Sequence, residues 1–205
     1  MKNLPQTIFF PSYFILLGCC IFLLSGGCKS SAPKAGKGDL TGFELVDIPG
    51  SSVKAAARKD PKGQVVMEGF VDGDKKTGEW MEYNNDGDII SINNYINGML
   101  EGPSLKLSFR GQVDQRVTYH LDQLDGPWVQ YKFGKVMETR SYKNGKLDGS
   151  VKIFDAKTYK LRQETEYKDG LQDGYFRYYD DDGNVSVEYV YKKGEKVSGG
   201  IVKKE

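Results

Sequence analysis

Few residues of this chain have the types and the spacing that catalysis requires. His120 is the only histidine, so any catalytic triad would depend on it alone. No serine stands in a Gly-x-Ser-x-Gly elbow, and no cysteine follows Cys28, which excludes thiol catalysis, disulfides and cysteine-based zinc sites beyond that residue. We expect a structural or solvent-exposed role for His120 and a protein that is not an enzyme. The enzymatic alternative requires an activity that is lost with His120→Ala.

A run of carboxylates near the end of the chain raises the question of a metal. Asp180-Asp181-Asp182-Gly183-Asn184 offers the oxygen ligands that Ca²⁺ prefers, but it lacks the alternating ligands and the distant glutamate of an EF-hand loop. The glycines of the chain form no Gly-rich phosphate loop between a strand and a helix. The sequence therefore predicts a turn at residues 180–184, with neither a metal nor another cofactor.

Large aromatic residues recur at fixed places and are the more informative group. Each set has an aromatic residue two positions after a glycine and a tyrosine three positions later. Such repeated positions predict packing between neighbouring hairpins. The alternative is an exposed aromatic strip, a surface suited to a protein, a glycan or a lipid head group. The candidate binding residues are Trp80, Tyr83, Trp128, Tyr131, Phe176 and Tyr179.

These aromatic residues lie within repeat units of about 24 residues. A unit begins with an aromatic residue, a turn and a glycine, as in Tyr142-Lys143-Asn144-Gly145, and a second glycine follows, here Gly149. Val136 stands six positions before Tyr142, and the other units keep a similar aliphatic residue. An even separation places two side chains on one face of a strand, so each unit is predicted to be two strands joined by tight Asp-Gly or Asn-Gly turns.

The repeat pattern starts at Phe70, with Asp72-Gly73 as its turn. Residues 51–69 are predicted to form a degenerate leading unit, because Gly63 precedes Phe70 by seven positions. Lysines in the last residues are predicted to keep the final sheet edge soluble and unpaired.

The charge balance argues against nucleic acid as a partner. The 29 basic residues nearly cancel the 28 acidic ones, for a formal net charge of +1. A chain with this balance creates no global field that would attract phosphate groups.

Two segments carry a resemblance to a known family. Tyr142-Lys143-Asn144-Gly145-Lys146-Leu147-Asp148-Gly149 and the segment from Tyr167 to Tyr179 resemble MORN repeats, in the variant of the YwqK-type antitoxin family. The resemblance covers about residues 63 to 200 and implies an all-β fold, in which antiparallel hairpins form one elongated, twisted meander sheet. The chain departs from the repeat at Asp122, where a glycine is expected, at the longer turn 155–159, and at Ser198.

The N-terminal residues resemble an export signal. Lys2 is followed by an apolar stretch from Ile8 to Leu24, and small residues precede Cys28. Leu24-Ser25-Gly26-Gly27-Cys28 resembles a lipobox, which implies a signal peptide at residues 1–27 and a lipid on Cys28. Cleavage before Cys19, within Leu16-Leu17-Gly18-Cys19, is one alternative, but it would leave apolar residues on the mature chain. An uncleaved membrane anchor is the other.

The remainder divides into a tether and a repeat domain. Residues 29–38 are Ser, Ala, Gly and Lys with one Pro, so residues 28–45 are predicted to be a flexible tether and residues 46–205 the repeat domain. The expected location is the cell envelope, with the chain anchored in a membrane, facing the periplasm or in the outer membrane.

These observations predict a non-catalytic, lipid-anchored envelope protein that presents a β-repeat surface to a macromolecular partner, most simply a protein. A glycan-binding module is an alternative, with retention on peptidoglycan or polysaccharide that drops on Trp80→Ala or Trp128→Ala. The MORN resemblance also implies phospholipid binding. The antitoxin family name implies neutralisation of a toxin, which ranks lower because an exported body would not meet a cytoplasmic toxin.

Overall fold

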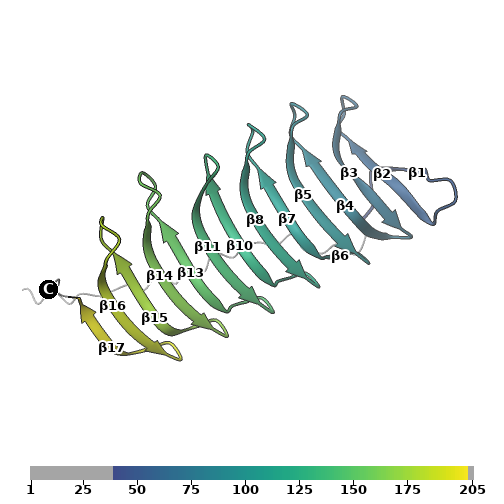
Figure 1. Ribbon diagram of the computed structural model, residues 1–205. Helices are drawn as coiled ribbons and strands as arrows, with labels where there is room; N and C mark the ends of the chain where they lie inside the picture. The colour runs from purple at the N-terminus through teal and green to yellow at the C-terminus, as the bar shows by residue number, and fades with distance from the viewer. Residues whose placement is uncertain (1–38, 203–205) are drawn as a thin grey trace, which may run out of the picture. The chain divides into compact units, whose positions relative to one another are not determined.

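The computed structural model describes residues 39–202, which form one antiparallel sheet (Figure 1). The first strand begins at Phe43, so ordered structure starts three residues before the predicted domain boundary at residue 46. The predicted signal peptide, Cys28 and the tether up to residue 38 lie outside the described residues. No helix occurs among the described residues, and thus none that is long and apolar enough to cross a bilayer.

The sheet is a meander of hairpins, as predicted, because each long strand pairs with the long strands before and after it in the chain. Three two-residue strands pair only with the strand that precedes them. Its two outermost strands each have one partner among the described residues, so the sheet is open. The 17 strands are β1 (Phe43–Asp47), β2 (Val53–Lys59), β3 (Val65–Asp72), β4 (Lys75–Tyr83), β5 (Ile89–Ile96), β6 (Met99–Leu100), β7 (Gly102–Leu107), β8 (Val113–His120), β9 (Gln123–Leu124), β10 (Gly126–Lys132), β11 (Lys135–Lys143), β12 (Lys146–Leu147), β13 (Gly149–Phe154), β14 (Leu161–Lys168), β15 (Leu171–Tyr179), β16 (Val185–Lys192) and β17 (Glu195–Ile201).

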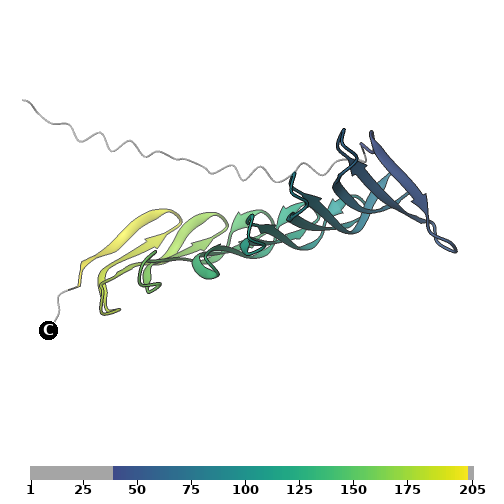
Figure 2. The same cartoon turned by 90° about the horizontal axis from the view of Figure 1, so that it is seen from above.

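Alternate turns of the meander lie at opposite long edges of the sheet. Turns within a unit line one edge, at the top of Figure 1, and we call it the within-unit edge. Turns between units line the other, the between-unit edge. Figure 2 shows that the strands of each hairpin are curved. The sheet therefore offers two faces and two rows of turns.

The between-unit turns have the predicted tight geometry. Asn97 and Gly98 both have positive φ, at 53° and 82°, as a two-residue hairpin of the primed type requires. Leu121 and Asp122 take the same place with φ of 49° and 66°, so the missing glycine at Asp122 leaves the turn intact. Left-handed backbone at two non-glycine residues is costly, and the surrounding sheet imposes it.

The first unit is displaced by one residue from the predicted register. Val71 takes the buried place that Tyr95 holds in the next unit and is 0% exposed, whereas Phe70 is 41% exposed. Its two-residue turn is Gly73-Asp74, one residue later than predicted, since Asp72 pairs with Lys75. One more residue lies between Phe70 and the second glycine of its unit than in the following unit, and this insertion explains the shift.

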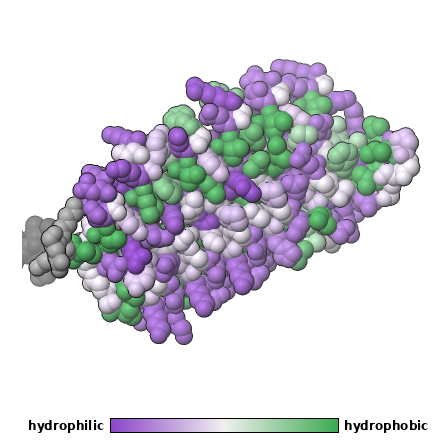
Figure 3. Space-filling model, in the orientation of Figure 1, coloured by the Kyte–Doolittle hydropathy of each residue, from purple (hydrophilic) through white to green (hydrophobic). Residues whose placement is uncertain are grey.

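The core occupies one face of the sheet, which we call the core face; the other is the outer face. Side chains alternate between the two faces along each strand. Figure 3 shows one of the two faces, on which hydrophobic residues form an interrupted band along the sheet with hydrophilic residues at the turns. The core is defined by burial. The core cluster consists of Ala56, Val71, Trp80, Tyr95, Leu100, Val117, Tyr119 and Trp128.

Carboxylates link each unit to the next along the between-unit edge. The residue before the second glycine of a unit is acidic in four units, and its side chain accepts a hydrogen bond from a backbone N–H in the turn one unit later. We call these contacts carboxylate clasps. They join Glu101 to Leu121, Asp125 to Asn144, Asp148 to Asp169 and Asp173 to Lys193, over 3.0, 3.0, 3.3 and 3.1 Å.

Candidate binding surfaces

The six predicted binding residues are divided between the two faces. In the three units that contain them, the aromatic residue after the second glycine and the following tyrosine lie three positions apart. An odd separation along a strand places side chains on opposite faces. Trp80, Trp128 and Phe176 lie on the core face, and Tyr83, Tyr131 and Tyr179 on the outer face. The six residues therefore form no single exposed strip.

Trp80 is a core residue. It is 2% exposed, and its ring packs edge-on against Phe43 and Tyr95, with centroids 5.5 and 6.4 Å away. Its indole N–H donates a hydrogen bond of 2.9 Å to the carbonyl oxygen of Phe70. The ammonium of Lys76 lies 4.1 Å from the ring centroid on the same face. Trp80 thus has the packing role that its repeated position predicted, and it presents no surface to a ligand.

Trp128 and Phe176 occupy the equivalent place in later units. Trp128 is buried, and the guanidinium carbon of Arg140 lies 4.5 Å from its ring centroid. Phe176 is half-buried and stacks on Tyr189 at 6.0 Å, with the Lys196 ammonium 4.4 Å from the Tyr189 centroid. A cation therefore covers the aromatic group in each of these units, as Lys76 does at Trp80, and a partner would meet charge before it met the rings.

Tyr83 and Tyr179 form hydrogen bonds with glutamates on the outer face. The Tyr83 hydroxyl donates a hydrogen bond of 2.5 Å to Glu68, and the Tyr179 hydroxyl one of 3.1 Å to Glu164. Burial, followed by the hydrogen bond to Glu68, raises the pKa of Tyr83 to about 12. Burial followed by the bond to Glu164 also raises the pKa of Tyr179. Both phenols are thus neutral donors committed to an internal partner.

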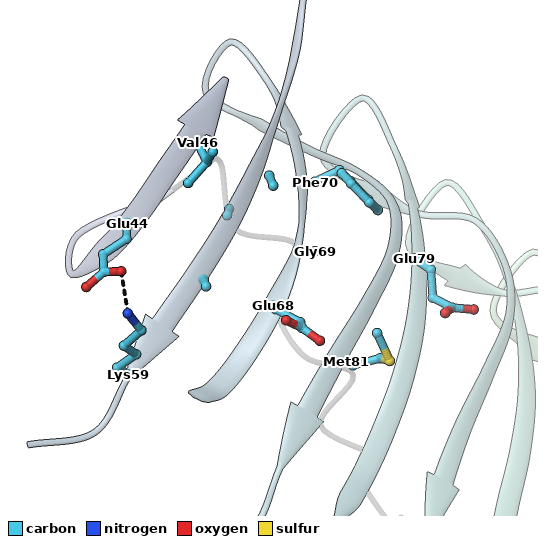
Figure 4. A pocket seen from close by; sticks show the side chains of 11 residues that line it. Glu44, Val46, Lys59, Glu68, Gly69, Phe70, Glu79 and Met81 are labelled. Carbon is cyan, nitrogen blue, oxygen red and sulfur yellow. Dashed lines mark hydrogen bonds and ion pairs between the residues drawn. The ribbon is translucent and has the colours of Figure 1, made fainter. Parts of the chain in front are cut away.

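A groove crosses the outer face over β1 to β4 (Figure 4). Ala55 and Ala57 form its floor, since their methyl groups leave room that larger side chains on a strand would fill. Val46 and Phe70 stand on either side, and Met81 lies farther along. The groove has a volume of about 470 Å³, which falls within the range of ligand pockets.

Carboxylates surround the apolar floor of this groove. Glu44 is paired with Lys59 at 2.7 Å, Glu68 accepts the bond from Tyr83, and Glu79 lines the groove from β4. Acidic groups therefore outnumber basic ones around an apolar base. A ligand that joins an apolar group to a cation fits this chemistry, whereas an anionic lipid head group would be repelled.

His120 is exposed at the between-unit edge, in agreement with the expected structural or solvent-exposed role. Its side chain is 58% exposed, and Nδ1 lies 3.0 Å from Oε1 of Glu101. The hydrogen bond to Glu101 raises the pKa of His120, and the same bond lowers the pKa of Glu101. The other oxygen of Glu101 accepts the N–H of Leu121 in a carboxylate clasp, so the pair belongs to the structure of the turn.

Residues 180–184 form the predicted turn. Oδ1 of Asp180 accepts backbone N–H bonds from Asp182 and Asn184, at 3.0 and 2.9 Å, and Gly183 has a φ of 88°. Asn84 makes the same pair of bonds in the first full unit, to Asp86 and Asp88. Within residues 39–202 no cluster of three or more His, Cys, Asp or Glu side chains is arranged to hold a metal ion.

Sequence reasoning missed several exposed apolar residues. Phe109 and Phe133 lie in within-unit turns and are 73% and 69% exposed. The signal was present, because other units place Asp86 or Asp182 in the corresponding turn. The alanines of the groove were also missed, since they belong to the leading unit, where the repeat pattern is weakest.

Comparison with known families supports the repeat assignment. Residues 76–97 and 172–193 match a MORN repeat variant. The two segments run from β4 and β15 to the following between-unit turns, so they lie near the two ends of the array. Repeats of this kind are generally modules that bind proteins or membranes. No curated protein matches the chain.

Proposed function

We propose that this chain is a non-catalytic, lipid-anchored protein of the cell envelope that presents its β-repeat array to a protein partner. The lipobox-like segment ending at Cys28 supplies the argument for the anchor. The open sheet supplies the argument for binding, because a long array of hairpins offers an extended surface on which many weak contacts add up.

The observation that carries the binding role is the groove over β1 to β4. Its apolar floor at Ala55 and Ala57 remains open, although a larger residue at either position would have filled it. Phe70 beside it is exposed and lies outside the core cluster. Apolar surface that the fold leaves uncovered in this way is typical of interaction sites.

A glycan-binding role has less support, because Trp80 and Trp128 were the residues assigned to it. Stacking on a sugar requires an accessible ring face, and both indoles are buried. Trp80→Ala or Trp128→Ala would also leave a cavity in the core. Loss of retention in such variants would therefore report unfolding as readily as lost binding. Neutralisation of a toxin is compatible with a protein-binding surface, but no described residue favours a toxin over another protein partner.

Site-specific photo-crosslinking in intact cells tests the binding role. A photoreactive amino acid at Ala57 is expected to give a discrete crosslinked protein, while one at Lys143 on the between-unit edge serves as the matched control. Absence of any adduct from Ala57, and from further exposed positions on both faces and both edges, would contradict the proposal.

The anchor is tested separately by intact mass and fractionation of the native chain beside Cys28→Ala. A diacylated Cys28 in the membrane fraction, with an uncleaved signal in the variant, is the expected result. An unmodified Cys28 removes the lipoprotein part of the proposal and makes a cytoplasmic, antitoxin-like role the better hypothesis.

A further inference from the structure

Three consecutive turns on the within-unit edge expose an aromatic residue. Phe109 lies between β7 and β8, Phe133 between β10 and β11, and Tyr159 between β13 and β14, with exposures of 73%, 69% and 40%. We call these three turns the aromatic tips. The turns on either side, residues 84–88 and 180–184, contain only Asn, Asp and Gly. The aromatic tips are thus a bounded patch in the middle of one edge and no general property of the repeat.

Each aromatic ring at the tips has a basic side chain beside it. The guanidinium carbon of Arg110 lies 5.1 Å from the Phe109 centroid, and the ammonium of Lys132 lies 5.8 Å from that of Phe133. The ammonium of Lys135, from the Phe133 turn, lies 5.9 Å from the Tyr159 centroid. This last contact shows that neighbouring tips are close enough to act as one surface.

A hollow of about 760 Å³ opens between these tips. Phe109, Tyr131, Phe133 and Met137 supply apolar walls, so one of the six predicted binding residues, Tyr131, belongs to it. Arg110 and Lys132 lie at the same hollow, with Asp114 as its one carboxylate. Basic groups therefore surround apolar walls here, which is the reverse of the charge around the groove over β1 to β4.

Carboxylates at the tips do not cancel this charge. Asp155 accepts backbone N–H bonds from Lys157 and Thr158 and pairs with Arg162 at 3.4 Å. Those two backbone bonds hold the pKa of Asp155 at about 2. Arg162 lies beside this carboxylate and also pairs with Asp181 at 2.6 Å, so it offsets only part of the Asp155 charge. The side chains that face outward from the three turns are thus mainly aromatic and cationic.

We infer that the aromatic tips are a docking site for an acidic protein segment that inserts an apolar side chain into the hollow between Phe109 and Phe133. Carboxylates of the segment would pair with Arg110, Lys132 and Lys135 around it. The inference rests on the proposed binding function and gives it a second site, besides the groove over β1 to β4, with a partner chemistry of its own. An anionic bilayer is the competing occupant, since exposed aromatics with basic residues also suit a membrane surface. The concave shape decides between them, because a bilayer presents no protruding group to fill a hollow.

Selection of short random peptides on the full chain, purified in detergent, tests this site. Enriched peptides are expected to carry acidic residues around an aromatic or large aliphatic residue. Phe109→Ser with Phe133→Ser should weaken their binding roughly tenfold or more, as loss of an interface anchor does. The matched control is Ile96→Ser with Leu171→Ser, which removes similarly exposed apolar side chains from the between-unit edge. Lys132→Glu with Lys135→Glu should also abolish binding, whereas Lys143→Glu with Lys168→Glu should not.

Two results would overturn the inference. The first is enrichment without an acidic bias, or binding that survives the changes at Phe109 and Phe133. The second is burial of the tips in a membrane. In that case brominated acyl chains would quench the additional tryptophan fluorescence that Phe133→Trp gives the chain reconstituted into phosphatidylglycerol vesicles. In-cell crosslinks from Ala57 but none from the tips would leave the binding function standing and remove only this site.

Discussion

The indole of Trp80 lies directly against Gly69 of the neighbouring strand, with no space between them for a single added carbon. This contact allows a large ring to lie on the sheet and reach both Phe43 and Tyr95. The φ of Gly69 is not in the left-handed region, so its backbone conformation would allow any residue. Glycine is required at this position because of the contact with Trp80.

Gly69→Ala is expected to destabilise the fold by about 1–3 kcal/mol, because the methyl group would collide with a buried ring that has nowhere to move. Chemical denaturation followed by tryptophan fluorescence measures the change. Gly200→Ala is the matched control: that glycine also lies in a strand without left-handed φ, and an added carbon there meets nothing within 4 Å. Equal stability of the two variants would show that the Trp80 contact is not restrictive.

Asp125→Ala should release the backbone amide of Asn144 from its carboxylate clasp. The expected loss is about 1 kcal/mol, the usual net value of a hydrogen bond at a partly exposed site. Hydrogen exchange offers a local readout, because the Asn144 amide should exchange faster in the variant. The Asp169 amide, held by Asp148, is the internal control and should keep its rate. Unchanged exchange at Asn144 would mean that the clasp contributes nothing.

Tyr83 and Tyr95 should ionise late in an alkaline titration followed by phenolate absorbance. Burial raises the pKa of each to about 12, against an ordinary value of 10.0. A group whose pKa is higher in the folded state supports folding below its unfolded pKa, so stability should decline between about pH 10 and pH 12. Tyr83→Phe should remove one of the late transitions and leave that of Tyr95. A single transition near pH 10 for all tyrosines would contradict the burial of both phenols.

His120 provides a test of the contact with Glu101 in solution. Its pKa should lie above the ordinary value, and Glu101→Gln should lower it, because the main cause of the shift is that hydrogen bond. The stability from the pair should be complete below the unfolded pKa of histidine, about 6.5, and disappear as the pH rises through the folded pKa. Proton NMR resolves the titration cleanly, since the chain has one histidine. An identical pKa in both proteins would count against the contact.

The fold could be predicted from the sequence because the repeat states the same pattern several times. The spacing of Val136 and Tyr142 indicated a strand, and Asn144-Gly145 indicated a tight turn; both are present. The shared face expected for Val136 and Tyr142 was wrong, because a register shift between them pairs Val136 with Tyr131 of the outer face. The register of the first unit was predicted wrongly, since Phe70 is the only aromatic residue available there and the inserted residue moves Val71 into the core. This shifted register occurs in one unit only, so no other unit repeats the pattern that would have revealed it.

The binding residues were harder to predict than the strands. Repetition identifies residues that the architecture needs, and Trp80 and Trp128 proved to be such residues. The odd separation of Trp128 and Tyr131 would have shown that a strip containing both is divided between two faces. Residues such as Phe109 and Phe133 stand out by departing from the repeat, so a search for what recurs passes over them.

The carboxylate clasps have a consequence for how such a chain changes length during evolution. Each clasp requires an acidic side chain in one unit but only a main-chain N–H in the next unit. Every residue except proline supplies that N–H. The requirement is one-sided. A duplicated or deleted unit therefore brings or removes its own clasp, and the junction needs no matched pair of substitutions to join again.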